Sequence, residues 1–219
     1  MMYLFSDTET GDLSPEAGDL LQAGFVLASP EFKELWAYEF GISQVDYRTS
    51  PGAMAVNQLD LDHLRKTGLL SPRVGRIEGI LADEDVDRAT TENILAQHKL
   101  REMHSKLVAL KEDRVEVVMV CHNVPFDKPF LKWFTWLESL ISYRTIDTIG
   151  VALTLQAAGL FRTKNVKLTT LTEHFKIEHS EAHSALADAR ADLHVLAKMV
   201  DLIKQLQTTR QIITSNSSI

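Results

Sequence analysis

Two acidic residues stand one residue apart near the start of the chain. The segment YLFSDTETGDL, residues 3–13, places Asp7 and Glu9 after a short apolar run. Residues two apart in a strand point to the same face, so these carboxylates project together. Like charges this close raise each other's pKa unless a cation or a hydrogen-bond donor compensates them. Taken alone, the pair favours a solvated strand end, and a site requires further acids from distant parts of the chain.

A third acid follows the most apolar segment. RVEVVMVCHN, residues 114–123, predicts a buried strand, and Asp127 comes just after it, where a helix is expected to begin near Lys128. Asp is a favoured helix N-cap, so capping explains Asp127 as well as a site does. His122 and Asn123 lie at the strand end, where open α/β sheets tend to bind ligands.

The last candidates lie near the C-terminus. EAHSALADARADLHVLAKMV, residues 181–200, predicts a helix with Asp188 and Asp192 one turn apart. His183 precedes Asp188 by five residues, about 140° around an ideal helix, so the two side chains would not share a face. They serve one site only if His183 lies in a loop before the helix. The alternative is an incidental histidine on a solvated face.

The elements that must position these residues predict an α/β protein. Strands are expected at 2–7, 19–29 and 32–43, then two short helices within 53–68 and an irregular segment near 69–87. The remaining elements complete a single domain, 1–207. They are a helix at 90–113, the strand described above, a helix at 128–140, a strand near 144–151 and helices to about 207. The polar residues 208–219 are expected to be a disordered tail. This order predicts a mixed β-sheet flanked by α-helices.

In order and spacing, the three acidic motifs resemble those of the DEDDh, or DnaQ-like, 3′–5′ exonuclease superfamily. Ribonuclease T and the proofreading subunit of bacterial replicative polymerases are members. The matching motifs are Asp7-Thr-Glu9, Asn123-Val-Pro-Phe-Asp127 and His183-Ser-Ala-Leu-Ala-Asp188. The resemblance covers almost the whole chain and implies a ribonuclease H-like fold. A sister group carries tyrosine four residues before the last acid, where this chain has Ser184.

The resemblance also implies a chemistry, namely metal-dependent hydrolysis of phosphodiester bonds from the 3′ end of DNA or RNA. Asp7, Glu9, Asp127 and Asp188 would supply hard oxygen ligands to Mg²⁺ or Mn²⁺, with two ions in the active site. His183 would be the general base, since an unperturbed pKa of about 6.5 suits proton removal near neutral pH. These five residues are the predicted catalytic set.

Predicted substrate contacts follow from the same resemblance, which places Thr10 and His122 beside the terminal nucleotide. The predicted substrate-binding residues are Thr8, Thr10, Asn57, His122 and Asn123. Lys164 and Lys167 lie on an expected loop, where they either meet the phosphate backbone or are simply solvated. The predicted partners are single-stranded 3′ ends, and a homodimer is possible because some members of the superfamily dimerise.

Bulk properties restrict these interpretations. The net charge is −7, which argues against a general electrostatic binder of nucleic acid unless the acids surround cations. Cys121 is the single cysteine, so an intramolecular disulfide is excluded and a reducing cytoplasm is expected. No apolar run approaches the roughly 18–20 residues of a membrane span, so no membrane partner is expected.

Two alternatives to a general exonuclease stay open. One is a phosphodiesterase for very short oligonucleotides, and the other is a catalytically idle, nuclease-like binding module. The second is disfavoured because all five predicted catalytic residues are present.

Overall fold

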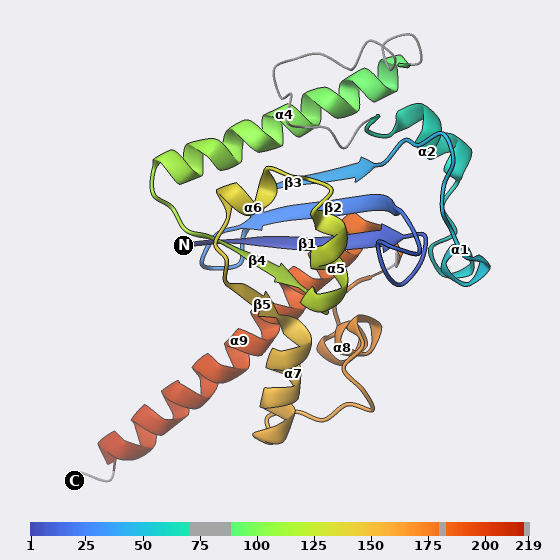
Figure 1. Cartoon of the computed structure of the whole chain (residues 1–219). Helices are drawn as coiled ribbons and strands as arrows, with labels where there is room; N and C mark the ends of the chain where they lie inside the picture. Colours follow the sequence, from blue (N-terminus) through green and yellow to red (C-terminus); the bar gives the residue numbers. More distant parts are fainter. Residues whose placement is uncertain (71–88, 180–182, 217–219) are drawn as a thin grey trace.

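A five-stranded mixed sheet forms the centre of the molecule (Figure 1). The computed structural model describes residues 1–70, 89–179 and 183–216, and of 209–216 the backbone alone. The sheet order is β3-β2-β1-β4-β5. Strands β1 (Met2–Thr10), β2 (Leu20–Ala28) and β3 (Glu34–Gly41) form an antiparallel meander, and β4 (Val117–Cys121) and β5 (Thr145–Asp147) continue it in parallel. The predicted mixed sheet is confirmed.

Both faces of the sheet are covered, which explains why neighbouring strand residues are both apolar. Leu4 and Phe5 of β1 point to opposite faces, and both are fully buried. Leu4 belongs to a core with Phe25 and Phe134, whereas Phe5 belongs to a separate core with Leu193. The strands are therefore held by two layers of helices.

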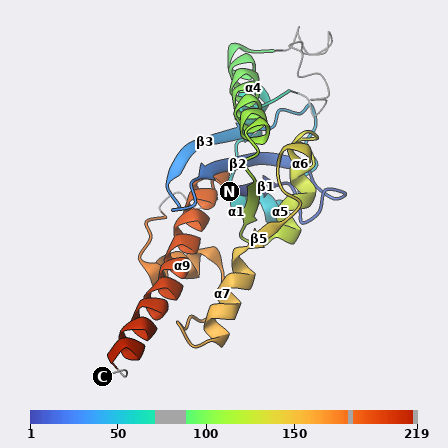
Figure 2. The same cartoon turned by 90° about the vertical axis from the view of Figure 1, so that its left-hand side faces the viewer.

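The first layer consists of α4 (Thr91–Glu112), α5 (Val124–Leu131) and α6 (Leu137–Leu140), which pack on the Leu4 side. Helix α4 begins at a capping box, in which the Thr90 side chain accepts from Asn93 N and the Asn93 side chain accepts from Thr90 N. Figure 2 shows α4 on the edge of the molecule formed by β3.

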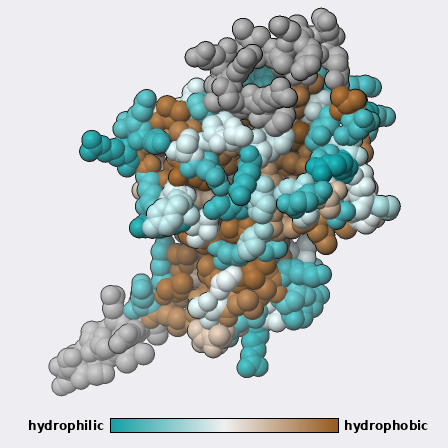
Figure 3. All heavy atoms as spheres, viewed as in Figure 1, coloured by the Kyte–Doolittle hydropathy of each residue, from teal (hydrophilic) through white to brown (hydrophobic). Residues whose placement is uncertain are grey.

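The second layer consists of α7 (Thr148–Ala157), α8 (Leu168–Phe175) and α9 (Ala185–Asn216), which pack on the Phe5 side. The N-terminal half of α9 crosses the sheet, and its C-terminal half extends away from the body (Figures 1 and 2). Apolar surface gathers over α7 in the lower half of Figure 3, where Leu153 is half exposed.

Helices α1 (Pro51–Asn57) and α2 (Leu61–Thr67) lie beyond the C-terminal end of β1 (Figure 1). The Asn57 side chain joins α1 to that end, because its Nδ2 donates to the carbonyl of Thr10 at 3.1 Å. No helix of the described residues is long and apolar enough to cross a membrane.

Several boundaries differ from the prediction. The strand expected near 144–151 ends at Asp147, because the Asp147 side chain caps α7, which begins at Thr148. Helix α5 begins at Val124 rather than near 128, because Asn123 adopts a left-handed backbone (φ 92°) that turns the chain at once out of β4. The expected helix 128–140 is in fact two short helices. Helix α9 continues to Asn216, through part of the expected tail, and most of the segment 69–87 lies outside the described residues.

Candidate active site

A cavity of about 500 Å³ opens at the C-terminal end of β1. Four of the five predicted catalytic residues line it: Asp7, Glu9, His183 and Asp188. The other lining residues are Thr8, Thr10, Asp12, Leu13, Ser50, Gly52, Ala53, Val56, Asn57 and Phe126. The cavity therefore joins an acidic wall to an apolar one.

The acidic wall brings together the first and last motifs. One ligand atom each of Glu9, His183 and Asp188 lies within 4.8 Å of the others. Asp7 is on the same strand as Glu9, and the negative charges of Glu9 and Asp188 help to raise its pKa. The predicted meeting of β1 with the start of α9 is thus present in the structure.

Asp127 completes the cluster from beneath the cavity wall. Its side chain is buried, and Oδ1 accepts from the backbone N of Thr8 at 3.0 Å and from the Thr8 hydroxyl at 2.8 Å. Asp127 lies inside α5, so the N-cap interpretation is wrong. Because the N-cap position belongs to Asn123, the Asp127 carboxylate is free to face β1.

The start of α9 is held by side chains of the neighbouring strands. Glu39 Oε1 accepts from the Ser184 hydroxyl at 2.8 Å and from Leu186 N at 3.1 Å, and Gln22 Oε1 accepts from Ala185 N at 3.1 Å. These contacts satisfy amide groups that a helix start leaves without partners. His183 precedes them with a left-handed backbone (φ 73°), which brings its exposed ring over the cavity rather than along the helix.

The pKa values of the acids are raised. Burial, reinforced by Asp188 and Asp127, raises the pKa of Glu9 to about 8. Burial raises the pKa of Asp127 to about 7, although the Thr8 hydrogen bonds oppose the rise. Burial and the carboxylates of Asp127, Asp188 and Glu9 raise the pKa of Asp7 well above its usual range. In each case the negative form lacks a compensating positive charge.

This donor set fits a hard divalent cation. The carboxylates supply oxygen atoms, which Mg²⁺ and Mn²⁺ prefer to nitrogen or sulfur. Within the described residues no lysine or arginine forms an ion pair with Asp7, Glu9, Asp127 or Asp188. A bound cation would remove the repulsion that raises the pKa values.

The predicted substrate-binding residues divide into two groups. Thr8, Thr10 and Asn57 line the cavity, although Thr8 also donates to Asp127 and Asn57 to Thr10. His122 and Asn123 do not line it. The His122 ring is nearly buried, and its Nδ1 lies 2.9 Å from the Thr148 hydroxyl. Asn123 is exposed and serves as the N-cap residue of α5.

Lys164 and Lys167 are exposed on the segment between α7 and α8, and neither lines the cavity. Their contact with phosphate stays a prediction.

Sequence reasoning missed two residues of this region. Asp192 is buried next to the His122 ring, 3.8 Å from its Nδ1, and neither Asp192 oxygen has a hydrogen-bond partner among the described residues. Burial raises its pKa to about 8, and the negative charges of Asp127, Asp147 and Asp188 act in the same direction. The spacing from Asp188 was visible in the sequence, but one helical turn is also common on solvated faces. The second residue, His179, hydrogen bonds to Asp188 and carried no motif signal.

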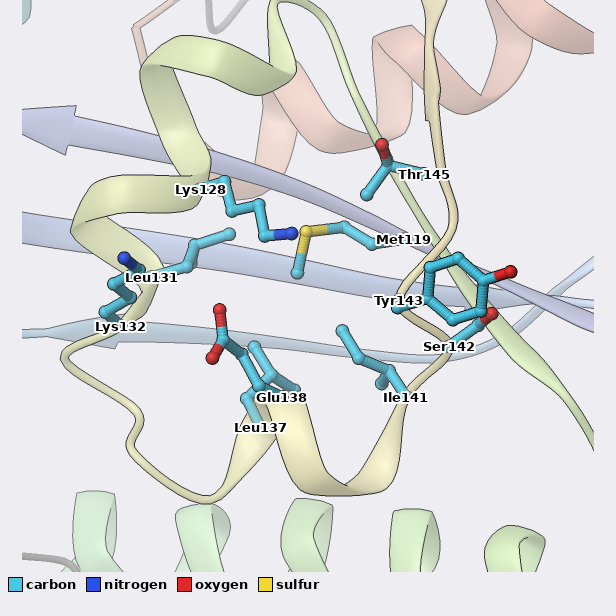
Figure 4. A pocket seen from close by; sticks show the side chains of 10 residues that line it. All are labelled: Met119, Lys128, Leu131, Lys132, Leu137, Glu138, Ile141, Ser142, Tyr143 and Thr145. Atoms are coloured by element: carbon cyan, nitrogen blue, oxygen red, sulfur yellow. The ribbon is translucent and has the colours of Figure 1, made fainter.

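A second cavity, of about 270 Å³, lies between α5, α6 and β5 (Figure 4). Met119, Leu131 and Ile141 form apolar parts of its lining, and Lys128 points into it. Glu138 is the single carboxylate among its lining residues, so this cavity lacks the donors that a divalent cation needs.

Comparison with known proteins agrees with the fold, a mixed five-stranded sheet between helices of the ribonuclease H-like kind. Residues 39–196, more than half of the chain, match the family profile described as exonuclease. The chain therefore belongs to the exonuclease family, within the DnaQ-like superfamily. No curated protein sequence matches it.

Solved structures of exonuclease I share the fold. The zinc-bound form of Escherichia coli exonuclease I with single-stranded DNA is 20% identical, with a TM-score of 0.66 over 100% of this chain and 45% of that chain. The same enzyme with a dT13 oligonucleotide is 19% identical, with a TM-score of 0.68 over 95% and 43%. Exonuclease I of Methylocaldum szegediense is 16% identical, with a TM-score of 0.66 over 94% and 41%. The chain spans less than half the length of these enzymes.

Proposed function

We propose that this chain is a divalent-cation-dependent 3′–5′ exonuclease that acts on single-stranded ends. The observation that carries the proposal is the convergence of Asp7, Glu9, Asp127 and Asp188 with His183 at one open cavity. Four carboxylates from three distant segments gather here, and no lysine or arginine of the described residues forms an ion pair with them. The proposal takes residues 1–207 as one catalytic domain.

The residues have distinct roles in this proposal. Asp7, Glu9 and Asp188 would hold one cation, and Asp7 with Asp127 a second. Cations held by these residues would supply positive charge to the scissile phosphate and would lower the pKa of the attacking water. His183 is exposed at the cavity wall, so it can take a proton from that water and pass it to solvent.

The apolar wall supports a nucleotide substrate. Leu13 and Val56 are largely exposed, and both line the cavity with Phe126. Exposed apolar side chains beside an acidic centre suit the face of a base whose phosphate lies among the cations. The net charge of −7 disfavours binding along a long duplex, and the exonuclease I structures hold single-stranded DNA or oligonucleotides. Together these points favour single-stranded DNA.

The proposal is tested with a 5′-labelled single strand, incubated with Mg²⁺ or Mn²⁺. We expect a ladder that shortens from the 3′ end, and we expect chelation of the cations to abolish it. Asp7→Ala should remove the activity, whereas Glu138→Ala, an exposed acid of the second cavity, should leave it intact. Activity that survives Asp7→Ala, or that needs no cation, would refute the mechanism.

Comparison of substrates separates the remaining alternatives. Equal rates on long DNA and RNA strands would show that the site does not distinguish deoxyribose from ribose. Cleavage restricted to dinucleotides would favour the oligonucleotide phosphodiesterase. Binding of a 3′ end without hydrolysis under any cation would favour the idle module. The cytoplasmic location and the homodimer stay predictions from the sequence.

A further inference from the structure

Two histidines, His179 and His183, lie close to the carboxylate of Asp188, and their side chains differ in exposure to solvent. His183 is exposed, lines the cavity and has a ring nitrogen within 4.8 Å of an Asp188 oxygen. His179 is not among the cavity-lining residues, and its side chain is 6% exposed. Its Nε2 hydrogen bonds to Asp188 Oδ1. The mechanism above uses His183 and leaves this buried contact without a role.

We propose that His179 is a positioning residue that holds the Asp188 carboxylate in the orientation required for cation binding. The inference rests on the proposed cation-dependent function and assigns a residue to it that no acidic motif contains. His179 itself neither binds the substrate nor moves a proton in the reaction.

The geometry of Asp188 explains why such a partner is needed. Asp188 lies in the first turn of α9 and is partly exposed at the edge of the cavity, with its side chain 14% accessible. An aspartate side chain there can rotate between staggered positions, and only some of them face Glu9. A hydrogen bond from the little-exposed His179 ring favours one position, and the carboxylate retains lone pairs for a cation.

The segment that carries His179 is anchored to the core of the second helical layer. Its chain neighbours Phe175 and Ile177 pack against the core that underlies α8 and α9. Leu171 of α8 is fully buried in the same core. His179 therefore lies on the segment that follows α8 and is anchored to this core by Phe175 and Ile177, whereas Asp188 belongs to α9. The hydrogen bond joins this segment to the first turn of α9.

The exposure of the two rings also argues against exchanging their roles. A general base must reach the attacking water and return its proton to solvent, which the exposed His183 can do. His179 is enclosed, and its Nε2 is already directed at Asp188. Partners that orient a metal-ligating carboxylate typically change metal affinity or activity by about 10–100-fold when they are removed.

The experiment compares His179→Leu with His179→Gln, because a glutamine amide can place a donor near the position of Nε2. The probe is Mn²⁺ alone, titrated calorimetrically without nucleic acid, so the readout does not depend on turnover. We expect His179→Leu to weaken Mn²⁺ binding about 10–100-fold and His179→Gln to restore most of it. The control is His194→Leu, an exposed histidine of the same helix as Asp188, which should bind Mn²⁺ as the unmodified chain does.

Kinetics then separate positioning from catalysis. In His179→Leu, saturating Mn²⁺ should recover much of the lost rate, and the pH dependence of the rate should keep its shape. In His183→Asn, Mn²⁺ binding should survive, while the rate falls about 10²–10⁴-fold at every Mn²⁺ concentration. Circular dichroism of each variant verifies that it is folded.

The outcomes distinguish the two proposals. If the unmodified chain binds Mn²⁺ but hydrolyses no nucleic acid, the proposed function fails, and the titration alone decides the role of His179 in Mn²⁺ binding. If His179→Leu is folded and binds Mn²⁺ as tightly as the unmodified chain, the positioning role is refuted. It is also refuted if His179→Leu loses rate at all Mn²⁺ concentrations and changes the pH profile, because His179 would then be the base.

Discussion

Gly24 of β2 lies directly against the backbone of Ala185, the first residue of α9. A Cβ at Gly24 would come within 2.3 Å of the Ala185 carbonyl group and within 2.4 Å of Leu186 N. Real side chains do not tolerate such contacts with backbone, so α9 would have to move away from β2. Because His183 and Asp188 flank this point, the close approach of two backbones sets the position of the last motif.

Gly24→Ala should therefore damage both stability and activity. We expect a loss of about 1–3 kcal/mol in the free energy of unfolding, measured with urea, and a fall in exonuclease rate. Gly150→Ala is the matched control, since a Cβ there meets no atom within 4 Å and lies in α7. It should stabilise the protein by up to about 1 kcal/mol, because alanine is favoured over glycine in helices. Unchanged activity in Gly24→Ala would show that the close approach of β2 and α9 does not set the position of His183 and Asp188.

Glu39 should be needed for the start of α9, although it lies on β3. Glu39→Ala removes the acceptor for the Ser184 hydroxyl and Leu186 N, which should lower stability by about 0.5–2 kcal/mol, as the loss of a helix cap does. The rate should fall as well, because His183 precedes the capped residues. Glu39→Gln keeps an amide oxygen at the same position and should retain most of both. A rate that is equally low in both variants would point to the charge of Glu39 instead.

The Thr8 hydroxyl should be needed to orient Asp127. Thr8→Val removes the donor at 2.8 Å and leaves the backbone donor at 3.0 Å. A hydrogen bond to a charged group contributes about 1.5–3 kcal/mol, so we expect weaker Mn²⁺ binding and a slower reaction. Thr8→Ser keeps the hydroxyl and should behave like the unmodified chain. Equal KM and rate in Thr8→Val would show that the backbone donor suffices.

Stability of the metal-free protein should decrease as pH rises toward 8. Burial raises the pKa of Asp192 from 3.8 to about 8, so the folded chain keeps a proton that the unfolded chain loses near pH 4. Between these values the folded state binds more protons, and each rise in pH therefore favours unfolding. Glu9, with a pKa of about 8, acts in the same direction.

Asp192→Asn removes one of these ionisations and keeps the shape of the side chain. At about pH 8 it should be more stable than the unmodified chain by about 1–3 kcal/mol, and its stability should depend less on pH. The control is Asp201→Asn, an exposed acid of the same helix. Chemical denaturation in the presence of a chelator provides the measurement. A parallel pH dependence in Asp192→Asn and the unmodified chain would contradict the raised pKa.

Cation binding should release protons. Glu9 and Asp127, with pKa values of about 8 and about 7, are partly protonated near neutral pH and must ionise to become ligands. The apparent affinity for Mn²⁺ should therefore rise from about pH 6 to about pH 8.5. Calorimetry in buffers of different protonation enthalpy measures the released protons. Binding that is independent of both pH and buffer would show that the acids are already ionised.

Some of the architecture was predictable because the signals are local. The apolar run Val117–Cys121 and the alternating acids in the C-terminal half of β1 depend on residues adjacent in sequence. The role of Asp127 was not predictable in this way. An aspartate after a strand has the same local signal whether it caps a helix or faces a site, and only the contact with Thr8, 119 residues away, separates the two.

The sequence by itself determined which chemical groups this protein can use: four carboxylates and a histidine in three motifs, in an order that identified the superfamily. The tertiary structure alone decided how they meet. Glu39 holds Ser184 across 145 residues, Gly24 admits the backbone of α9, and His179 fixes Asp188. Such contacts depend on sheet register and on the closeness of two backbones. Neither leaves a periodic pattern in the chain, because each depends on residues that only the folded sheet brings together.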